Sequence, residues 1–254
     1  MRYIDGGVCA SKGFKATGLN AGIKNNVKKD MALVFSEMPC VKAGTFTTNR
    51  VCAAPVKWDK KVVFESKSAQ AIVVNSGIAN ACTGEEGYEK CREMAAKTAE
   101  KLGIDEDAVL VASTGVIGKQ LPMDIIGKGI DRLPGQLGET AADAALAAEA
   151  IMTTDTKSKQ VAVEFEIEGT MVHIGGMCKG SGMIHPNMAT MLCFITSDAA
   201  IDEKLLQNMV RSIVDDTFNM ISVDGDTSTN DSVLLLANGM AGNKKIENEK
   251  SAGY

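Results

Sequence analysis

The chain has 254 residues, 45% of them hydrophobic and 23% charged, so it is long enough for one large domain or two small ones and can bury a sizeable core. Its net charge of -5 argues against a nucleic-acid partner, and no run approaches the roughly 18 apolar residues that a membrane helix needs. Seven cysteines without a C-x-x-C pair and only two histidines argue against a disulfide framework and a zinc site, so we expect a cytoplasmic protein without a metal.

The first half of the chain predicts strands separated by glycine-rich turns. Residues 31–49 contain two short apolar runs, which we expect to be separate strands broken at Pro39 and Gly44. A buried strand is expected at 71–74. The spacing of apolar residues then predicts an amphipathic helix that ends at Gly103.

The second half repeats this mixture of strands and helices. A short strand at 109–112 is expected to end in a turn at 113–115, and 138–152 has strong helix propensity. Residues 161–167 alternate apolar and polar, which predicts a strand that buries Val161, Val163, Phe165 and Ile167 and returns through a hairpin to a strand at 171–175. A helix capped by Asp202 and a last buried strand follow. The pattern is not a strict βαβ repeat, so we predict a mixed α/β fold with largely antiparallel sheets layered with helices.

Thr190 lies between a glycine-rich loop and an apolar, strand-like run. A hydroxyl is a weak nucleophile, but cutting the chain before a threonine frees an α-amino group that can take its proton. That amine titrates near pH 8 or below, which suits a general base, and the small Ala189 before Thr190 suits such a cut. The alternative is a threonine that simply opens a strand.

Three other segments contain candidate site residues. The Thr114 hydroxyl and Gly115 amide have the donors that an oxyanion hole needs, although a plain turn explains them as well. Lys179 offers a point charge for a substrate carboxylate, or is a solvated lysine. Thr153 lies in a hydroxyl-rich segment that capping and turn formation also explain.

Two further motifs are rejected. Residues 224–231 alternate acidic and amide groups, but Thr229 and Leu235 stand where a calcium loop requires glycine and glutamate. The glycines between 175 and 182 complete neither nucleotide-binding loop pattern.

Taken together, the sequence resembles the ornithine acetyltransferase family, the bifunctional glutamate N-acetyltransferases of arginine biosynthesis. The resemblance spans nearly the whole chain and is carried, in family order, by "GGVCASKGFKATGLNAGIK", "VNSGIANACTG", "ASTGVIG", "MTTDTK", "KGSGMIHPNMATML" and "SVDGDTSTND". It implies a self-cleaving precursor of the N-terminal-threonine-nucleophile type, cut between Ala189 and Thr190 into an α chain (1–189) and a β chain that begins at Thr190.

The resemblance also implies roles for the candidate residues. Thr190 would accept the acetyl group of N2-acetylornithine and pass it to glutamate, Thr114 and Gly115 would form the oxyanion hole, and Thr153 and Lys179 would bind substrate beside Thr190. It implies no cofactor, acetyl-CoA as a second acetyl donor in bifunctional members, small-molecule substrates, and an α2β2 assembly.

Family members continue well beyond the length of this chain, which has 65 residues from Thr190 onward, so the sequence is expected to be a truncated form. Substrate ligands that the family draws from the remaining part have no counterpart here. Two other interpretations stay open: a self-processing amidohydrolase or aminopeptidase in which water replaces glutamate, and an inactive fragment.

Overall fold

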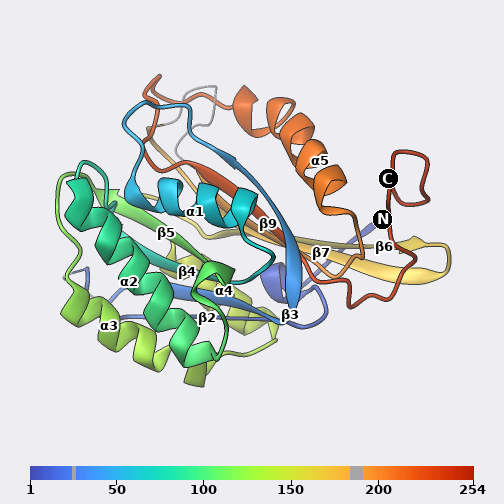
Figure 1. Cartoon of the computed structure of the whole chain (residues 1–254), viewed down its shortest axis with the longest axis horizontal. Coiled ribbons are helices and arrows are strands. Elements are labelled where there is room, and N and C mark those ends of the chain that lie inside the picture. Colours follow the sequence, from blue (N-terminus) through green and yellow to red (C-terminus); the bar gives the residue numbers. More distant parts are fainter. Residues whose placement is uncertain (25–26, 184–190) are drawn as a thin grey trace.

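The computed structural model describes residues 1–24, 27–183 and 191–254. Within that part, one nine-stranded sheet runs in the order β1-β6-β7-β8-β9-β3-β4-β5, and β2 also pairs with β3 (Figure 1). The strands are β1 (Arg2–Ile4), β2 (Phe14–Leu19), β3 (Met31–Phe46), β4 (Ala69–Ile78), β5 (Val109–Val116), β6 (Lys159–Ile167), β7 (Thr170–Lys179), β8 (Leu192–Ser197) and β9 (Ser232–Ala237). The helices are α1 (Ala54–Glu65), α2 (Gly84–Leu102), α3 (Met123–Arg132), α4 (Ala141–Ala150) and α5 (Glu203–Asp215).

Strand pairing confirms the predicted fold class. Only the β4–β5 and β8–β9 pairs are parallel; the other pairs among the described strands are antiparallel. None of the helices in this part of the chain combines the length and apolar character needed to cross a membrane.

The two short strands expected between residues 31 and 49 are in fact one strand, β3. Its first part pairs with β2 and β4 and its last part with β9, and the register shifts between Phe35 and Cys40. Pro39 lies within this shift, where the regular hydrogen bonding between strands is interrupted. The sheet therefore loses no hydrogen bond because proline lacks an N–H. Gly44 continues the strand and pairs with Leu234 on β9, and an added Cβ at Gly44 would lie 3.2 Å from the Leu234 side chain. β3 therefore joins the two halves of the sheet.

Two other strands are longer than predicted. Ser113, Thr114 and Gly115 do not form a turn but continue β5 alongside the end of β4. The return strand of the β6–β7 hairpin does not stop at Gly175 but extends to Lys179, because β8 pairs with it up to that residue. The predicted helix ending before Gly103 is confirmed as α2, with Gly103 in the left-handed conformation that ends helices.

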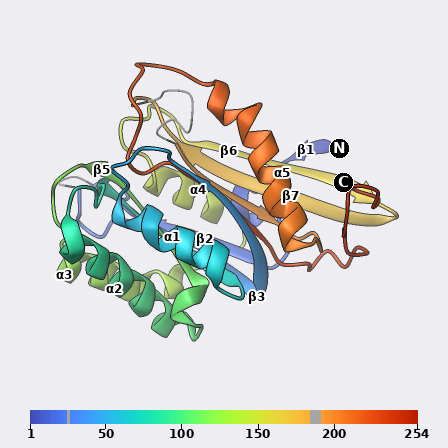
Figure 2. The ribbon, with the colours of Figure 1, turned by 45° about the horizontal axis from the view of Figure 1, so that its top comes forward.

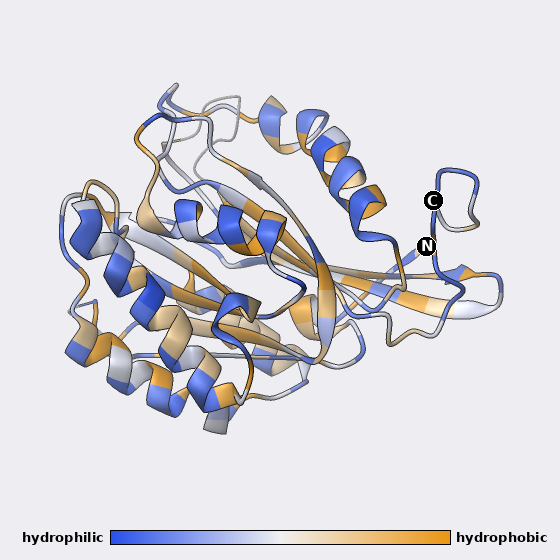
Figure 3. Cartoon of the chain, viewed as in Figure 1, coloured by the Kyte–Doolittle hydropathy of each residue, from blue (hydrophilic) through white to orange (hydrophobic). Residues whose placement is uncertain are grey.

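Helices cover the two halves of the sheet unequally. α1 and α2 pack on the β4–β5 end, α4 packs mainly on β2, and α5 packs mainly on β3 (Figures 1 and 2). The hydrophobic residues gather on the strands and on the inner faces of these helices (Figure 3). Contact between α4 and β2 is close: an added Cβ at Gly18 would lie 2.1 Å from the Leu146 carbonyl oxygen.

The β6 strand buries the opposite face from the one predicted, except at its end. Ala162 and Glu164 are buried, whereas Val161 is 54% exposed and Val163 half-buried; Ile167 is buried as expected. The Ala162 side faces the 3-10 turn η1 (Gly7–Cys9) and α4, and the Glu164 carboxylate is paired with Arg2. On the other side, α5 packs mainly on β3, so within the described part of the chain Val161 stays exposed and Val163 half-buried.

Candidate active site

The ends of distant strands bring together two of the predicted site residues. Lys179 ends β7, and Thr114 lies near the end of β5 at the far edge of the sheet. The Lys179 Nζ donates to Thr114 Oγ1 at 3.2 Å, and both residues are buried. The sheet therefore curls enough for its two halves to meet at this point.

Gly115 follows Thr114 in a conformation that requires glycine. Its φ is 132°, and an added Cβ would lie 2.2 Å from the backbone carbonyl carbon of Gly77 at the end of β4. Substitution would push β4 and β5 apart, so this close strand contact fixes the position of Thr114.

Thr153 is linked to the backbone directly after Lys179 through the carboxylate of Asp155. The Thr153 amide donates to Asp155 Oδ2 at 3.4 Å, and Asp155 Oδ1 accepts from Lys159 Nζ at 2.5 Å and from the Gly180 amide at 2.8 Å. Burial alone raises the pKa of the Asp155 carboxyl, but the Lys159 ammonium, these amides and the charge of Lys179 outweigh burial and lower it. Asp155 therefore stays ionised and anchors the backbone directly after Lys179.

Asp231 is a member of the cluster that the sequence did not reveal. Its Oδ1 accepts from the Met191 amide at 3.0 Å, and it lies fully buried just before β9. Burial raises the pKa of Asp231 to about 7, although the Met191 amide, the Ser228 hydroxyl and the Lys179 ammonium oppose this. The sequence signal was weak: an aspartate directly before a buried apolar run, in a segment that carries the family resemblance but whose chemistry was weighed only as a calcium loop.

Asn230 links this segment to β5, which carries Thr114, and to the residue after β4. Its Nδ2 donates to the carbonyl oxygens of Ala79 at 2.6 Å and Ser113 at 2.8 Å. The Thr229 hydroxyl donates to Asn230 Oδ1 at 2.6 Å, which fixes the orientation of the amide. Thr229 counted against calcium at the sequence level, and its role here is to hold Asn230.

Lys179 is a buried cation compensated by these acids. Burial lowers the pKa of Lys179, while the charges of Asp155 and Asp231 oppose this shift. Among the described residues, no three His, Cys, Asp or Glu side chains converge as a metal site would require.

Ala189 and Thr190, the predicted scission residues, lie outside the described residues. Met191, which follows Thr190 in the chain, is the nearest described residue, and its amide is bound to Asp231.

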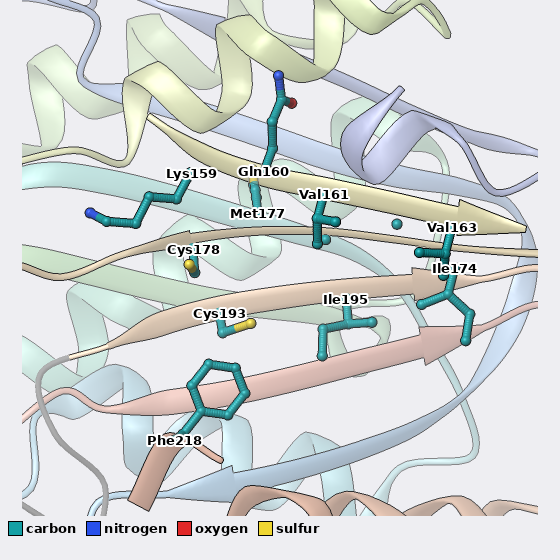
Figure 4. Close-up of a pocket in the computed structure, with 12 residues that line it drawn as sticks. Lys159, Gln160, Val161, Val163, Ile174, Met177, Cys178, Cys193, Ile195 and Phe218 are labelled. Carbon is teal, nitrogen blue, oxygen red and sulfur yellow. The ribbon is translucent and has the colours of Figure 1, made fainter. Parts of the chain in front are cut away.

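A separate apolar cavity of about 350 Å³ opens on the uncovered side of β6, β7 and β8. Val161, Val163, Ile174, Cys193, Ile195 and Phe218 line it (Figure 4). Cys178 lines it as well, and because side chains alternate along a strand, Lys179 points to the opposite face. The cavity is therefore not the place where Lys179 and Thr114 meet.

Fold and site together define a mixed α/β protein in which a lysine and a threonine near the ends of distant strands, and an aspartate just before a third strand, are buried. The sequence model of the ArgJ family matches residues 15–252, and the chain belongs to this family.

Known proteins similar to this chain carry related names. It is 55% identical over 249 residues to the arginine biosynthesis bifunctional protein ArgJ of Symbiobacterium thermophilum, covering 97% of this chain and 61% of the relative. It is 52% identical over 244 residues to a glutamate N-acetyltransferase of Methanocaldococcus jannaschii, covering 95% and 59%. The structure of an ornithine acetyltransferase from Mycobacterium tuberculosis, complexed with ornithine, superposes with a TM-score of 0.68 at 37% identity, covering 75% of this chain and 99% of that chain. The chain thus spans about six tenths of the length of these curated relatives.

Proposed function

We propose that this chain carries the nucleophile and part of the substrate site of an acetyltransferase that moves the acetyl group of N2-acetylornithine to glutamate. The observation that carries this proposal is the buried contact between Lys179 and Thr114, because it joins two residues assigned to one site by resemblance. Its nearest support from known proteins is the similarity to a glutamate N-acetyltransferase and to an ornithine acetyltransferase complexed with ornithine.

In the proposed reaction, the Thr190 hydroxyl attacks the acetyl carbonyl carbon while the freed α-amino group of Thr190 takes its proton. The Thr114 hydroxyl and the Gly115 amide stabilise the oxyanion, and the bond between the acetyl carbon and the ornithine nitrogen breaks as that nitrogen is protonated. The glutamate amine then attacks the acetyl-threonine ester and releases the Thr190 oxygen. Lys179 and Thr153 hold the substrate, Lys179 as a point charge for a carboxylate.

Activation by scission between Ala189 and Thr190 is part of the proposal. The Mycobacterium tuberculosis chain is matched over 99% of its length by 75% of this chain, which is the proportion expected of a piece that ends at residue 189. We extend the proposal to an α2β2 assembly in the cytoplasm without a cofactor, and to acetyl-CoA as a second donor, since the Symbiobacterium thermophilum relative is named bifunctional.

Intact-mass measurement tests the proposal directly. The purified chain should separate under denaturing conditions into pieces of 189 and 65 residues, whereas Thr190→Ala should stay whole. After incubation with N2-acetylornithine, the lighter piece should gain one acetyl group, and glutamate should remove it.

The matched control is Thr170→Ala, which changes a threonine in the β6–β7 hairpin and should leave the two pieces unchanged. A Thr190→Ala chain that still splits at the same bond contradicts the assignment of the nucleophile. Release of free acetate at the same rate with and without glutamate would instead indicate a hydrolase.

A further inference from the structure

The residue after Thr190 is held on both sides by the start of β9. The Met191 amide donates to Asp231 Oδ1 at 3.0 Å, and the Met191 carbonyl oxygen accepts from the Ser232 amide at 3.1 Å. Asp231 is itself fixed, because its carbonyl oxygen accepts from the Thr47 amide at 2.9 Å. These hydrogen bonds fix the backbone directly after the proposed scission position.

The second carboxylate oxygen of Asp231 has no such partner. Oδ2 is buried and has no hydrogen-bond partner of ordinary geometry within the described part of the chain, although the Ser228 hydroxyl partly opposes the rise that burial causes in the pKa of Asp231. Leaving a buried polar atom without a partner costs on the order of 1–3 kcal/mol, and more for a charged group. If Asp231 served only to hold the Met191 amide, an uncharged asparagine would do so without burying a charge.

Among the described residues, the cation whose charge acts on Asp231 is Lys179, at the end of β7. Burial lowers the pKa of Lys179, the charges of Asp155 and Asp231 oppose this shift, and the charge of Lys159 on β6 adds to it. The pKa of Asp231 is raised to about 7, chiefly by burial, so its charge changes near neutral pH. Protonation of Asp231 removes one of the two acids that compensate the buried ammonium of Lys179.

We propose that Asp231 is a positioning residue of the acetyltransferase site, which fixes the backbone after Thr190 through Oδ1 and whose charge helps to compensate the buried ammonium of Lys179. This inference rests on the proposed function but is separable from it. Asp231 acts through Met191 and Lys179, and no contact with substrate is needed.

Scission of freshly made precursor gives a clean readout, because the Thr190 nitrogen is still in a peptide bond and has no amine to titrate. Precursor made by cell-free synthesis is shifted to buffers from about pH 5 to about pH 9, and the 189-residue piece is followed by mass spectrometry. The rate for the unchanged chain should fall as the pH decreases below about 7.

Two variants separate the two functions of Asp231. Asp231→Asn keeps an oxygen for the Met191 amide but has no charge, so its scission rate should lose the fall below neutral pH. Asp231→Ala loses the hold on Met191, and its rate should be about 100-fold lower at every pH, the cost typical of misplacing a reacting group by about 1 Å. Circular dichroism establishes that each variant is folded.

Two controls complete the experiment. His185→Gln removes the titratable histidine nearest in sequence and should keep the fall in rate, and Asp59→Asn changes another buried aspartate and should leave the whole profile unchanged. If Asp231→Asn keeps the fall in rate, or if His185→Gln abolishes it, the inference is overturned. Absence of scission in the unchanged chain contradicts the proposed function instead.

Discussion

Lys179 combines a buried position with a positive charge, which is a costly combination unless the charge is compensated. The Thr114 hydroxyl accepts a hydrogen bond from Lys179, and the charges of Asp155 and Asp231 compensate its charge. None of these three residues lies on β7, the strand that ends at Lys179. A lysine held in this way has little freedom to move, so a carboxylate that binds it meets a preorganised charge.

Lys179→Met should therefore impair substrate binding more than folding. The methionine fills a similar volume without the charge. If Lys179 binds the substrate carboxylate as proposed, loss of that charged hydrogen bond should raise KM for N2-acetylornithine about 10- to 100-fold. Steady-state kinetics on the folded variant measures this change in KM. Lys42→Met is the matched control: Lys42 is also buried and pairs with Glu203 at 2.7 Å, so its loss should lower stability but leave KM unchanged. Equal KM values for Lys179→Met and the unchanged chain would make Lys179 structural.

At this scale the sequence predicted Thr114 and Lys179 as site residues, and the structure places them in contact. It could not predict Asp155 and Asp231, because their importance comes from what folding places beside them. Asp155 looked like a residue of an ordinary turn, and Asp231 lies 40 residues from the amide that it binds. Thr190 stays a prediction.

At the scale of elements, side chains of α1 bind backbone groups of the edge strand β5 that a neighbouring strand would otherwise bind. β5 is the last strand of the sheet, and two consecutive side chains of α1 bind its backbone. Trp58 Nε1 donates to the Val109 carbonyl oxygen at 2.8 Å, and the Val111 amide donates to Asp59 Oδ1 at 2.8 Å. These bonds satisfy backbone groups of the edge and block pairing with another chain there.

Asp59 makes this arrangement sensitive to pH. Burial raises its pKa well above the ordinary 3.8, outweighing the Val111 amide, and its Oδ2 has no hydrogen-bond partner in the described part of the chain. Above about pH 4 the unfolded chain releases a proton that the folded chain keeps, so the Asp59 contribution to the free energy of unfolding falls by about 1.4 kcal/mol per pH unit until the folded-state pKa is passed.

Asp59→Asn should remove this pH dependence while keeping an acceptor for the Val111 amide. Urea unfolding of both proteins at a series of pH values measures it. The stability of the unchanged chain relative to the variant should decrease as the pH rises from about 4. A difference that stays constant with pH would mean that Asp59 has the same pKa in the folded and unfolded states.

Local signals decided which elements the sequence could predict. α2 was predicted well because its apolar spacing and the glycine that ends it are both properties of the segment itself. β3 was not, because Pro39 is tolerated only through a register shift that depends on the strands on either side. The end of β5 was taken for a turn because Gly115 suggests one, whereas the close approach of β4 explains that glycine.

At the scale of the whole molecule, the described helices cover a sheet face only in part. α5 packs on the β3 side of that face, and the strip over β6, β7 and β8 forms the apolar cavity beside Phe218. The sequence predicted the apolar stripe of β6 correctly but assumed that an apolar stripe is covered. Whether a face has a layer above it depends on the rest of the fold, which a single strand does not encode.

Two substitutions should therefore differ sharply in their effect on stability. Leu234→Ala removes a fully buried side chain from the core and should cost about 2–5 kcal/mol in the free energy of unfolding. Val161→Ala, on the uncovered strip, should change it by less than about 0.5 kcal/mol. Urea denaturation at fixed pH compares them, and a comparable loss for Val161→Ala would show that the strip is covered in solution.

The pairing of β7 with β8 has a consequence for a chain that is nicked between them. These strands are antiparallel neighbours from Ile174 and Ser197 to Lys179 and Leu192, and their connection contains the bond before Thr190. In the order β7-β8-β9-β3, the two strands of the lighter product lie between two strands of the heavier one. The products of such a cut would be interleaved within one sheet. The cut would free two chain ends without breaking a strand pair, and the pieces would part only when the β7–β8 and β9–β3 pairs both open.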